Sequence, residues 1–136
     1  MCPSKKVPPI AGKPQPSQTT KAAGDVAESE ALQRLLNAGL ILLQRNYRTP
    51  GRGGGEIDLI MRETDGTVVF VEVRARQTAD YGGAASSVTP RKQRRIIWAA
   101  RRYLQRWLQL PPCRFDVLAR EGSEWHWLKG AFDAGF

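Results

Sequence analysis

The chain has 136 residues, a length that suits one domain with one hydrophobic core and is short for two. Its 41% hydrophobic and 25% charged residues are ordinary for a folded protein, and no apolar run approaches the roughly 18 residues that span a bilayer. The start of the chain carries no apolar segment of the secretory type. We therefore expect a cytoplasmic protein with no membrane partner.

Cysteine and histidine are too scarce for a disulfide framework or a zinc pattern. The two cysteines, Cys2 and Cys113, lie far apart, and His126 is the single histidine. Any metal site must therefore use oxygen ligands, which favours Mg²⁺ or Mn²⁺ over Zn²⁺.

The net charge of +8 is unevenly distributed. Residues 1–21 hold four lysines, no acid and five of the nine prolines, which predicts a disordered basic tail before a folded domain at 22–136. Residues 91–106 hold seven lysines and arginines and no acid. A polyanion is the natural partner, although solubility alone also explains a modest excess of positive charge.

The first predicted elements are a helix over about 25–37, ended by Gly39, and a strand over 40–48. A glycine-rich loop follows at 49–55. These glycines are not followed by GK[ST], so they do not form a phosphate-binding P-loop.

Two strands between residues 56 and 76 form a predicted hairpin, for which two registers are conceivable. A two-residue turn at Asp65 and Gly66 would mix charge into both faces. A three-residue turn at 64–66, with its glycine left-handed, makes one face wholly apolar. We favour the second register, which pairs Ile57 with Val73, Leu59 with Val71 and Met61 with Val69.

The same register places Asp58 opposite Glu72 and Glu56 opposite Arg74. Opposed like charges destabilise a sheet, and their Cβ atoms would be about 5 Å apart. Such a pair is tolerated if one acid is protonated or if a divalent cation lies between them, which suggests a metal site. The alternative is a solvated sheet face on which Glu56 pairs with Arg74 and the acids are exposed.

A third acid, Glu28, falls on the apolar stripe of the first helix with Leu32 and Leu35. A carboxylate on a buried stripe needs a partner. The alternative is a capping box, in which Asp25 is the N-cap and Glu28 reaches back to it.

After a loop at 77–88, Thr89 and Pro90 predict the N-cap and first turn of a helix that runs to about residue 108. Strands are predicted at 114–119 and 125–128. The order αβββαββ, with hairpins rather than regular βαβ units, predicts a mixed α+β sheet flanked by helices.

On the second helix the basic side chains share a side away from the apolar stripe. They could follow a phosphate backbone or form a solvated outer face: Arg91, Arg95, Arg102 and Arg106.

Aromatic and polar residues elsewhere favour structural roles. We expect His126 to be structural and Asp116 to be a strand or edge acid. We also expect the tryptophans to pack in the core or at edges: Trp98, Trp107, Trp125 and Trp127.

Several motifs occur in order along residues 22–134: Gly24-Asp25 with Glu28, GEIDLI at 55–60, FVEVRAR at 70–76, YGGAASSVTPRKQ at 81–93 and RFDVL at 114–118. In these motifs the chain resembles the YraN-like family, a bacterial group within the PD-(D/E)XK nuclease-like superfamily that is related to Holliday junction resolvases. The resemblance implies a restriction-endonuclease-like fold with a central mixed sheet.

The resemblance also implies a site. By position, the helix acid of the superfamily falls on Glu28, its motif aspartate on Asp58 and the acid of its E-x-K motif on Glu72. In the superfamily such acids hold Mg²⁺ or Mn²⁺ for hydrolysis of phosphodiester bonds in DNA, including branched DNA. Symmetric resolution of a junction would require a homodimer.

One residue departs from the motif. Arg74 stands where the superfamily has a lysine, and an arginine cannot act as a general base. Three explanations are open. Arg74 could bind phosphate while the metal-bound water needs no lysine, or catalysis could be weak. Alternatively, Lys92 on the second helix could take the role of the motif lysine. Three functions stay open: a metal-dependent endonuclease, a nucleic-acid-binding module with little or no cleavage, and a protein-binding adaptor.

Overall fold

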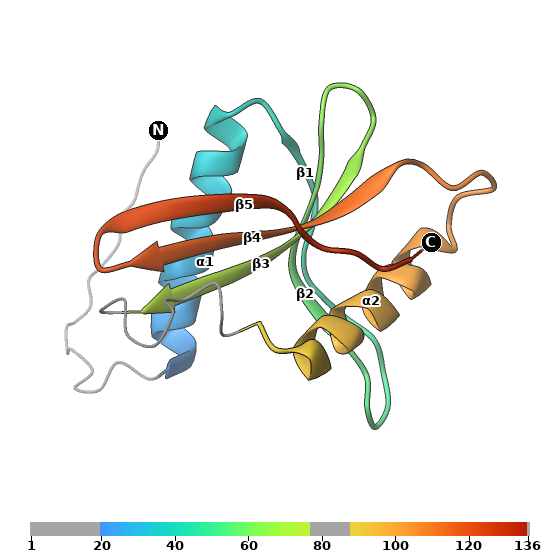
Figure 1. Cartoon of the computed structure of the whole chain (residues 1–136), viewed down its shortest axis with the longest axis horizontal. Helices are drawn as coiled ribbons and strands as arrows, with labels where there is room; N and C mark the ends of the chain where they lie inside the picture. Colours follow the sequence, from blue (N-terminus) through green and yellow to red (C-terminus); the bar gives the residue numbers. More distant parts are fainter. Residues whose placement is uncertain (1–19, 77–87, 136) are drawn as a thin grey trace, which may run out of the picture.

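The computed structural model describes residues 20–76 and 88–135 (Figure 1). Most of the predicted basic tail and of the loop at 77–88 lies outside the described residues. The elements are α1 (Thr20–Asn37), β1 (Ile41–Arg48), β2 (Glu56–Arg62), β3 (Val68–Arg76), α2 (Pro90–Leu104), β4 (Cys113–Glu121) and β5 (Glu124–Phe132). Their order confirms the predicted αβββαββ arrangement and the mixed α+β class.

The five strands form one mixed sheet in the order β1-β2-β3-β4-β5. Strands β3 and β4 are parallel, because α2 lies between them in the chain, and the other three neighbouring pairs are antiparallel. Parallel neighbours need such a crossover connection, whereas antiparallel neighbours can be joined by short turns.

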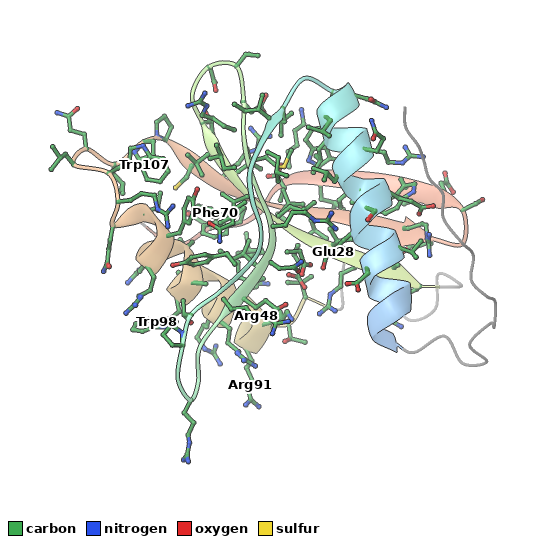
Figure 2. All side chains as sticks on the ribbon, turned by 180° about the vertical axis from the view of Figure 1, so that it is seen from behind. Glu28, Arg48, Phe70, Arg91, Trp98 and Trp107 are labelled. Carbon is green, nitrogen blue, oxygen red and sulfur yellow. The ribbon has the colours of Figure 1, made fainter. Side chains whose placement is uncertain are left out.

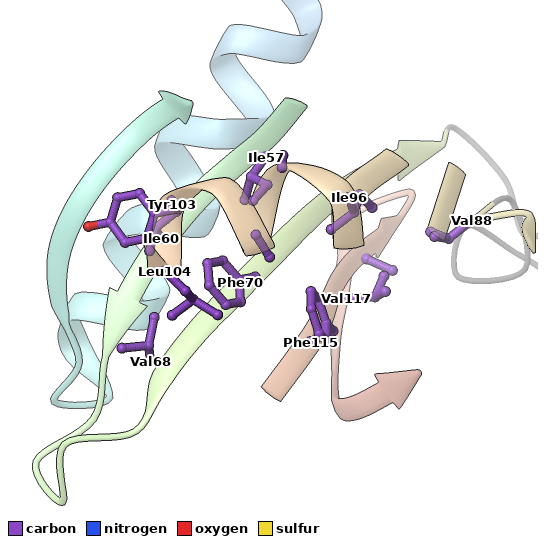
Figure 3. Packing of buried hydrophobic residues seen from close by; sticks show 13 residues of the cluster. Ile57, Ile60, Val68, Phe70, Val88, Ile96, Tyr103, Leu104, Phe115 and Val117 are labelled. Atoms are coloured by element: carbon purple, nitrogen blue, oxygen red, sulfur yellow. The ribbon is translucent and has the colours of Figure 1, made fainter. Parts of the chain in front are cut away.

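The two helices cover opposite faces of the sheet (Figure 1). Apolar residues of α1 pack with Leu59, Val69 and Val71, and those of α2 pack with Ile60, Val68 and Phe70. Figure 3 shows the α2 side, where Phe70 stacks on Phe115 with ring centroids 5.3 Å apart. The middle of β3 is therefore apolar on both faces, as is usual for a strand covered by helices on each side.

The predicted hairpin register is confirmed. Leu59 pairs with Val71 and Met61 with Val69. The backbone N–H of Glu63 donates to the carbonyl of Thr67 at 2.9 Å, and Gly66 has φ 94°. A left-handed glycine at the end of a three-residue turn is the conformation this register requires.

One part of the apolar pairing was wrong. Ile57 was expected on the same face as Leu59, but it packs in the cluster under α2, whereas Leu59 packs under α1. The change of side falls at Asp58, beyond the last pair of the β2–β3 ladder, Leu59 with Val71. Beyond that pair β2 no longer pairs with β3, so pairing with β3 does not fix which face of the sheet each β2 side chain occupies.

Three boundaries also differ from the predictions. Helix α1 begins at Thr20 rather than near Asp25, so Asp25 lies inside the helix and the capping-box explanation of Glu28 is wrong. Helix α2 ends at Leu104, where the next backbone N–H groups bond three residues back instead of four. Strand β5 is longer than predicted, because residues beyond Leu128 continue to pair with β4.

At the start of α2 the structure confirms the predicted cap. The Thr89 hydroxyl accepts from the backbone N–H of Lys92 at 3.2 Å, and Pro90 occupies the first turn.

The last glycine of the loop at 49–55 permits close packing of α2 on β2. A Cβ atom at Gly55 would lie 2.0 Å from the carbonyl oxygen of Arg95 and 3.1 Å from the Ala99 Cβ. Only a residue without a side chain fits there, so Gly55 sets how closely α2 approaches the sheet.

Candidate functional site

The candidate site forms where β2 and β3 stop pairing. Beyond Leu59, the partly buried Asp58 carboxylate takes the place of a backbone acceptor: its Oδ2 accepts the N–H of Val73 at 2.9 Å. This bond fixes the carboxylate of β2 beside β3, next to the residue that precedes Val73, which is Glu72.

Glu72 is buried, with 4% of its surface exposed. Its Oε2 lies 3.6 Å from Lys92 Nζ and 3.5 Å from Arg74 Nε. Burial, and then the charge of Asp58, raise the pKa of Glu72 to about 8 against the lowering effect of Lys92 and Arg74. The site therefore holds Glu72 largely protonated at neutral pH unless more positive charge is supplied.

Glu28 reaches the same region from α1, and it is labelled in Figure 2. Only 9% of its surface is exposed, and its Oε1 has no hydrogen-bond partner, although Arg45 Nη2 lies 3.7 Å away. Burial and then the charge of Asp58 raise the pKa of Glu28 to about 7. The pKa of Asp58 is also raised, chiefly by burial, against the lowering effect of the Val73 N–H.

Three buried or half-buried carboxyls from α1, β2 and β3 thus act on one another electrostatically. Each would gain from a positive partner, and carboxylate oxygens are the ligands that Mg²⁺ and Mn²⁺ prefer. Within residues 20–76 and 88–135, however, no group of three or more acid, cysteine or histidine side chains is arranged to hold a metal ion. The acid pair of the two strands could hold an ion together with water and substrate, which is a common way for proteins to bind Mg²⁺.

In the alternative of a solvated sheet face, Glu56 pairs with Arg74; in the structure it pairs with a different arginine. Glu56 Oε2 lies 3.6 Å from Arg48 Nη2, a residue of the neighbouring strand β1. Glu30 of α1 bonds Arg120 of β4 at 2.7 Å. An open hollow beside the acids is lined by Gly24, Asp25, Glu28, Asn46, Arg48 and Glu56.

The basic residues in and just after α2 lie in different environments. Lys92, one of the candidates for the role of the motif lysine, reaches Glu72. Arg95 donates to the carbonyl of Gly54 at 2.8 Å and 3.2 Å, so it also ties α2 to the loop before β2. Arg91 and Arg102 are exposed on the helix, whereas Arg106 lies past its end with its guanidinium 3.8 Å from the centre of the Tyr103 ring.

The four tryptophans do not share one environment. Trp107 lies beyond the end of α2 and packs on Tyr103 with centroids 5.6 Å apart. Trp125 and Trp127 are partly buried on β5 under the cations of Arg34 and Lys129. Trp98 alone among them has more than half of its surface exposed, 53%, so the expected core or edge packing was wrong for it.

Asp116 is a buried acid outside this cluster, and the sequence did not reveal its role. It lies on β4 between two neighbouring strands, so it is an interior acid and not an edge acid. Its oxygens accept from Arg114 Nε at 3.0 Å and 3.1 Å, from Trp127 Nε1 at 2.9 Å and from the Gly130 N–H at 2.9 Å. A β-bulge supplies the last partner: three residues of β5, 129–131, lie opposite Asp116 alone, and Gly130 has φ 61°.

The fold and site define a mixed α+β protein with a partly satisfied carboxylate cluster at the point where two central strands part. None of the described helices is long and apolar enough to cross a membrane. The model of the uncharacterised protein family UPF0102 matches residues 27–119, and the chain belongs to this family.

Curated relatives support the assignment. A UPF0102 protein of Acidovorax sp. (strain JS42) is 61% identical over 119 residues, covering 88% of this chain and 90% of the relative. Another, from Albidiferax ferrireducens, is 65% identical over 116 residues, covering 85% and 91%. A third, from Polaromonas sp. (strain JS666 / ATCC BAA-500), is 56% identical and covers 95% and 93%. No solved structure matches the chain.

Proposed function

We propose that this protein is a metal-dependent endonuclease of the PD-(D/E)XK type that hydrolyses phosphodiester bonds of DNA, with branched DNA as the first substrate to test. One observation carries the proposal: three separate elements bring Glu28, Asp58 and Glu72 into electrostatic contact. A chain that needed these acids only for solubility would leave them exposed and apart.

Asp58 and Glu72 would hold Mg²⁺ or Mn²⁺, with Glu28 beside them. When bound, such an ion supplies an activated water at neutral pH and neutralises charge on the phosphate. The chain itself contributes fixed carboxylate geometry, since Asp58 is anchored by the Val73 N–H. Arg74 and Lys92 contribute positive charge where negative charge develops on the phosphate.

The position of Lys92 bears on the missing motif lysine. Its Nζ approaches Glu72 from α2 as closely as Arg74 does from β3, 3.6 Å against 3.5 Å. Lysine is one of the side chains that can act as a general acid or base, and arginine is not. Lys92 therefore supports a cleavage role for a site whose E-x-K position holds arginine.

The first test is cleavage of end-labelled four-way junction, duplex and single-stranded DNA in Mg²⁺ and in Mn²⁺. We expect cutting by the unmodified chain and none by Asp58→Asn or Glu72→Gln. Lys92→Ala should slow cutting by about 100-fold or more, the usual loss on removing a proton-transfer group. Lys92→Arg separates the two possible roles, because it keeps the charge but cannot exchange a proton.

A second candidate is a nucleic-acid-binding module with little or no cleavage. It is favoured by Arg74 at the lysine position and by the lack, in the described part of the chain, of a three-acid group arranged for a metal. Binding of all three DNAs without cutting in either metal would select this candidate. Sedimentation of the same samples would show whether a homodimer, which symmetric junction cutting requires, forms.

A further inference from the structure

Helix α2 presents a basic outer face with a tryptophan at its centre. On a helix surface the neighbours of a residue lie three and four positions away. For Trp98 these neighbours are all exposed arginines: Arg94, Arg95, Arg101 and Arg102. The opposite side of the helix is the one that is buried against the sheet. The indole therefore belongs to the charged face and not to the core.

The candidate active site lies beside the first turn of the same helix. Lys92, which lies 3.6 Å from Glu72, precedes Trp98 by six residues, or about 9 Å along the helix axis. Arg91 projects from the same end of the helix, and Figure 2 shows both Arg91 and Trp98 pointing away from the sheet. A strand bound along α2 could therefore place one of its phosphates at the acids.

The chemistry of this face indicates what kind of molecule it binds. Residues 91–106 contain no acid, so the partner carries negative charge. Arginines bind phosphates without regard to sequence, and an exposed aromatic ring adds a flat surface on which a base can stack. Bases inside a duplex are already stacked on their neighbours, so an indole at this position finds a partner only where a base is unpaired.

We infer that the face formed by Arg91, Arg94, Trp98, Arg101 and Arg102 binds nucleic acid with unpaired bases, such as a single strand or a branch point. Trp98 stacks on one base while the arginines contact phosphates. The inference rests on the proposed function, because it names the substrate class that this face presents to the acid site.

The test is binding of the full chain to a labelled single-stranded oligonucleotide and to a duplex of equal length. Fluorescence anisotropy measures both affinities. A chelator in both samples prevents metal-dependent cutting, so binding is read separately from cleavage. The variants are Trp98→Ala and Trp98→Phe. The matched control is Leu108→Ala, which removes another exposed apolar side chain, in this case beyond the end of α2.

We expect Trp98→Ala to weaken single-strand binding about 10-fold and duplex binding less than about twofold, since one base stack is lost. Trp98→Phe should keep most of the single-strand affinity that Trp98→Ala loses. Leu108→Ala should change neither affinity. Thermal unfolding of each variant confirms that the exposed substitutions leave the fold intact.

Other outcomes overturn the inference in distinguishable ways. Equal losses on both DNAs, or no loss, would remove the stacking role and leave the endonuclease proposal standing. Binding of poly-glutamate with the same dependence on Trp98 would assign the face to an acidic protein. The absence of any nucleic-acid binding would overturn both proposals, whereas Trp98-dependent binding without metal-dependent cleavage would overturn the endonuclease alone.

Discussion

Asp116 and Glu72 are buried carboxylates on the neighbouring strands β4 and β3, where Asp116 pairs with Val71 and Glu72 with Val117. Their surroundings differ completely. Asp116 accepts hydrogen bonds from a guanidinium, an indole and a backbone N–H. Glu72 has two cations at 3.5 Å and 3.6 Å and a pKa raised to about 8. Burial alone does not mark a functional acid; a buried acid whose charge is poorly compensated does.

The largest expected effect is at the fully satisfied acid. Asp116→Ala should lower the free energy of unfolding by about 3 to 5 kcal/mol, because the part-buried Trp127 indole and Gly130 N–H lose their acceptor and Arg114 keeps only its pair with Glu63. Urea denaturation measures the loss. The control is Glu124→Ala on β5, at an exposed position where a change within about 0.5 kcal/mol is expected. A loss at Asp116 no greater than at Glu124 would remove the structural role given to Asp116.

The acid cluster should respond to pH in the opposite sense from a usual salt bridge. The folded pKa of Glu72, about 8, is above its ordinary 4.5, so between these values the folded state binds more protons than the unfolded state. Stability therefore falls as pH rises from about 4.5 to 8, by about 1 kcal/mol for each pH unit. Glu28, with a pKa of about 7, adds a slope of the same sign.

Glu72→Gln separates this contribution from the rest. The variant should lose much of the slope and be more stable than the unmodified chain at pH 8 but not at pH 5. Unfolding in urea at several pH values between 5 and 8 is the measurement. An unchanged slope in the variant would show that Glu72 does not titrate in this window.

A divalent ion should stabilise the folded chain through the acid cluster and not through Asp116. At 100 times its dissociation constant, Mn²⁺ or Mg²⁺ would stabilise the folded chain by about 2.7 kcal/mol at pH 8, where the cluster is ionised. Asp58→Ala should abolish this gain, and Asp116→Ala, despite its lower stability, should keep it. Thermal unfolding with and without the ion decides. Equal stabilisation of the Asp58 variant would place the ion elsewhere.

Local patterns in the sequence were sufficient to predict the hairpin. Alternating apolar residues and one glycine in the turn determine the register of β2 and β3, and that register brings Asp58 near Glu72. The Thr89 cap is likewise a local feature. In both cases the residues that determine the structure lie within a few positions of one another in the chain.

Features that depend on distant residues could be predicted only in part, and Lys92 was one of several candidates for the role of the motif lysine. The approach of Lys92 to Glu72 depends on how closely α2 packs, which Gly55 sets from a loop far earlier in the chain. The role of Asp116 depends on a bulge in β5, for which Gly130 is the one signal in the sequence of that strand. The exposure of Trp98 could have been inferred from its arginine neighbours at helical spacing, since the buried stripe of α2 lies on the other side.

The parallel pairing of β3 with β4 has a consequence for synthesis of the chain. All four groups of the candidate site, Glu28, Asp58, Glu72 and Lys92, are made before residue 93, yet β3 gains its second neighbour only when residues 113–121 leave the ribosome. A nascent chain that ends after α2 therefore contains every reactive group but not the sheet that positions them. The acids of such a chain are therefore not yet held in the arrangement that raises their pKa in the complete fold.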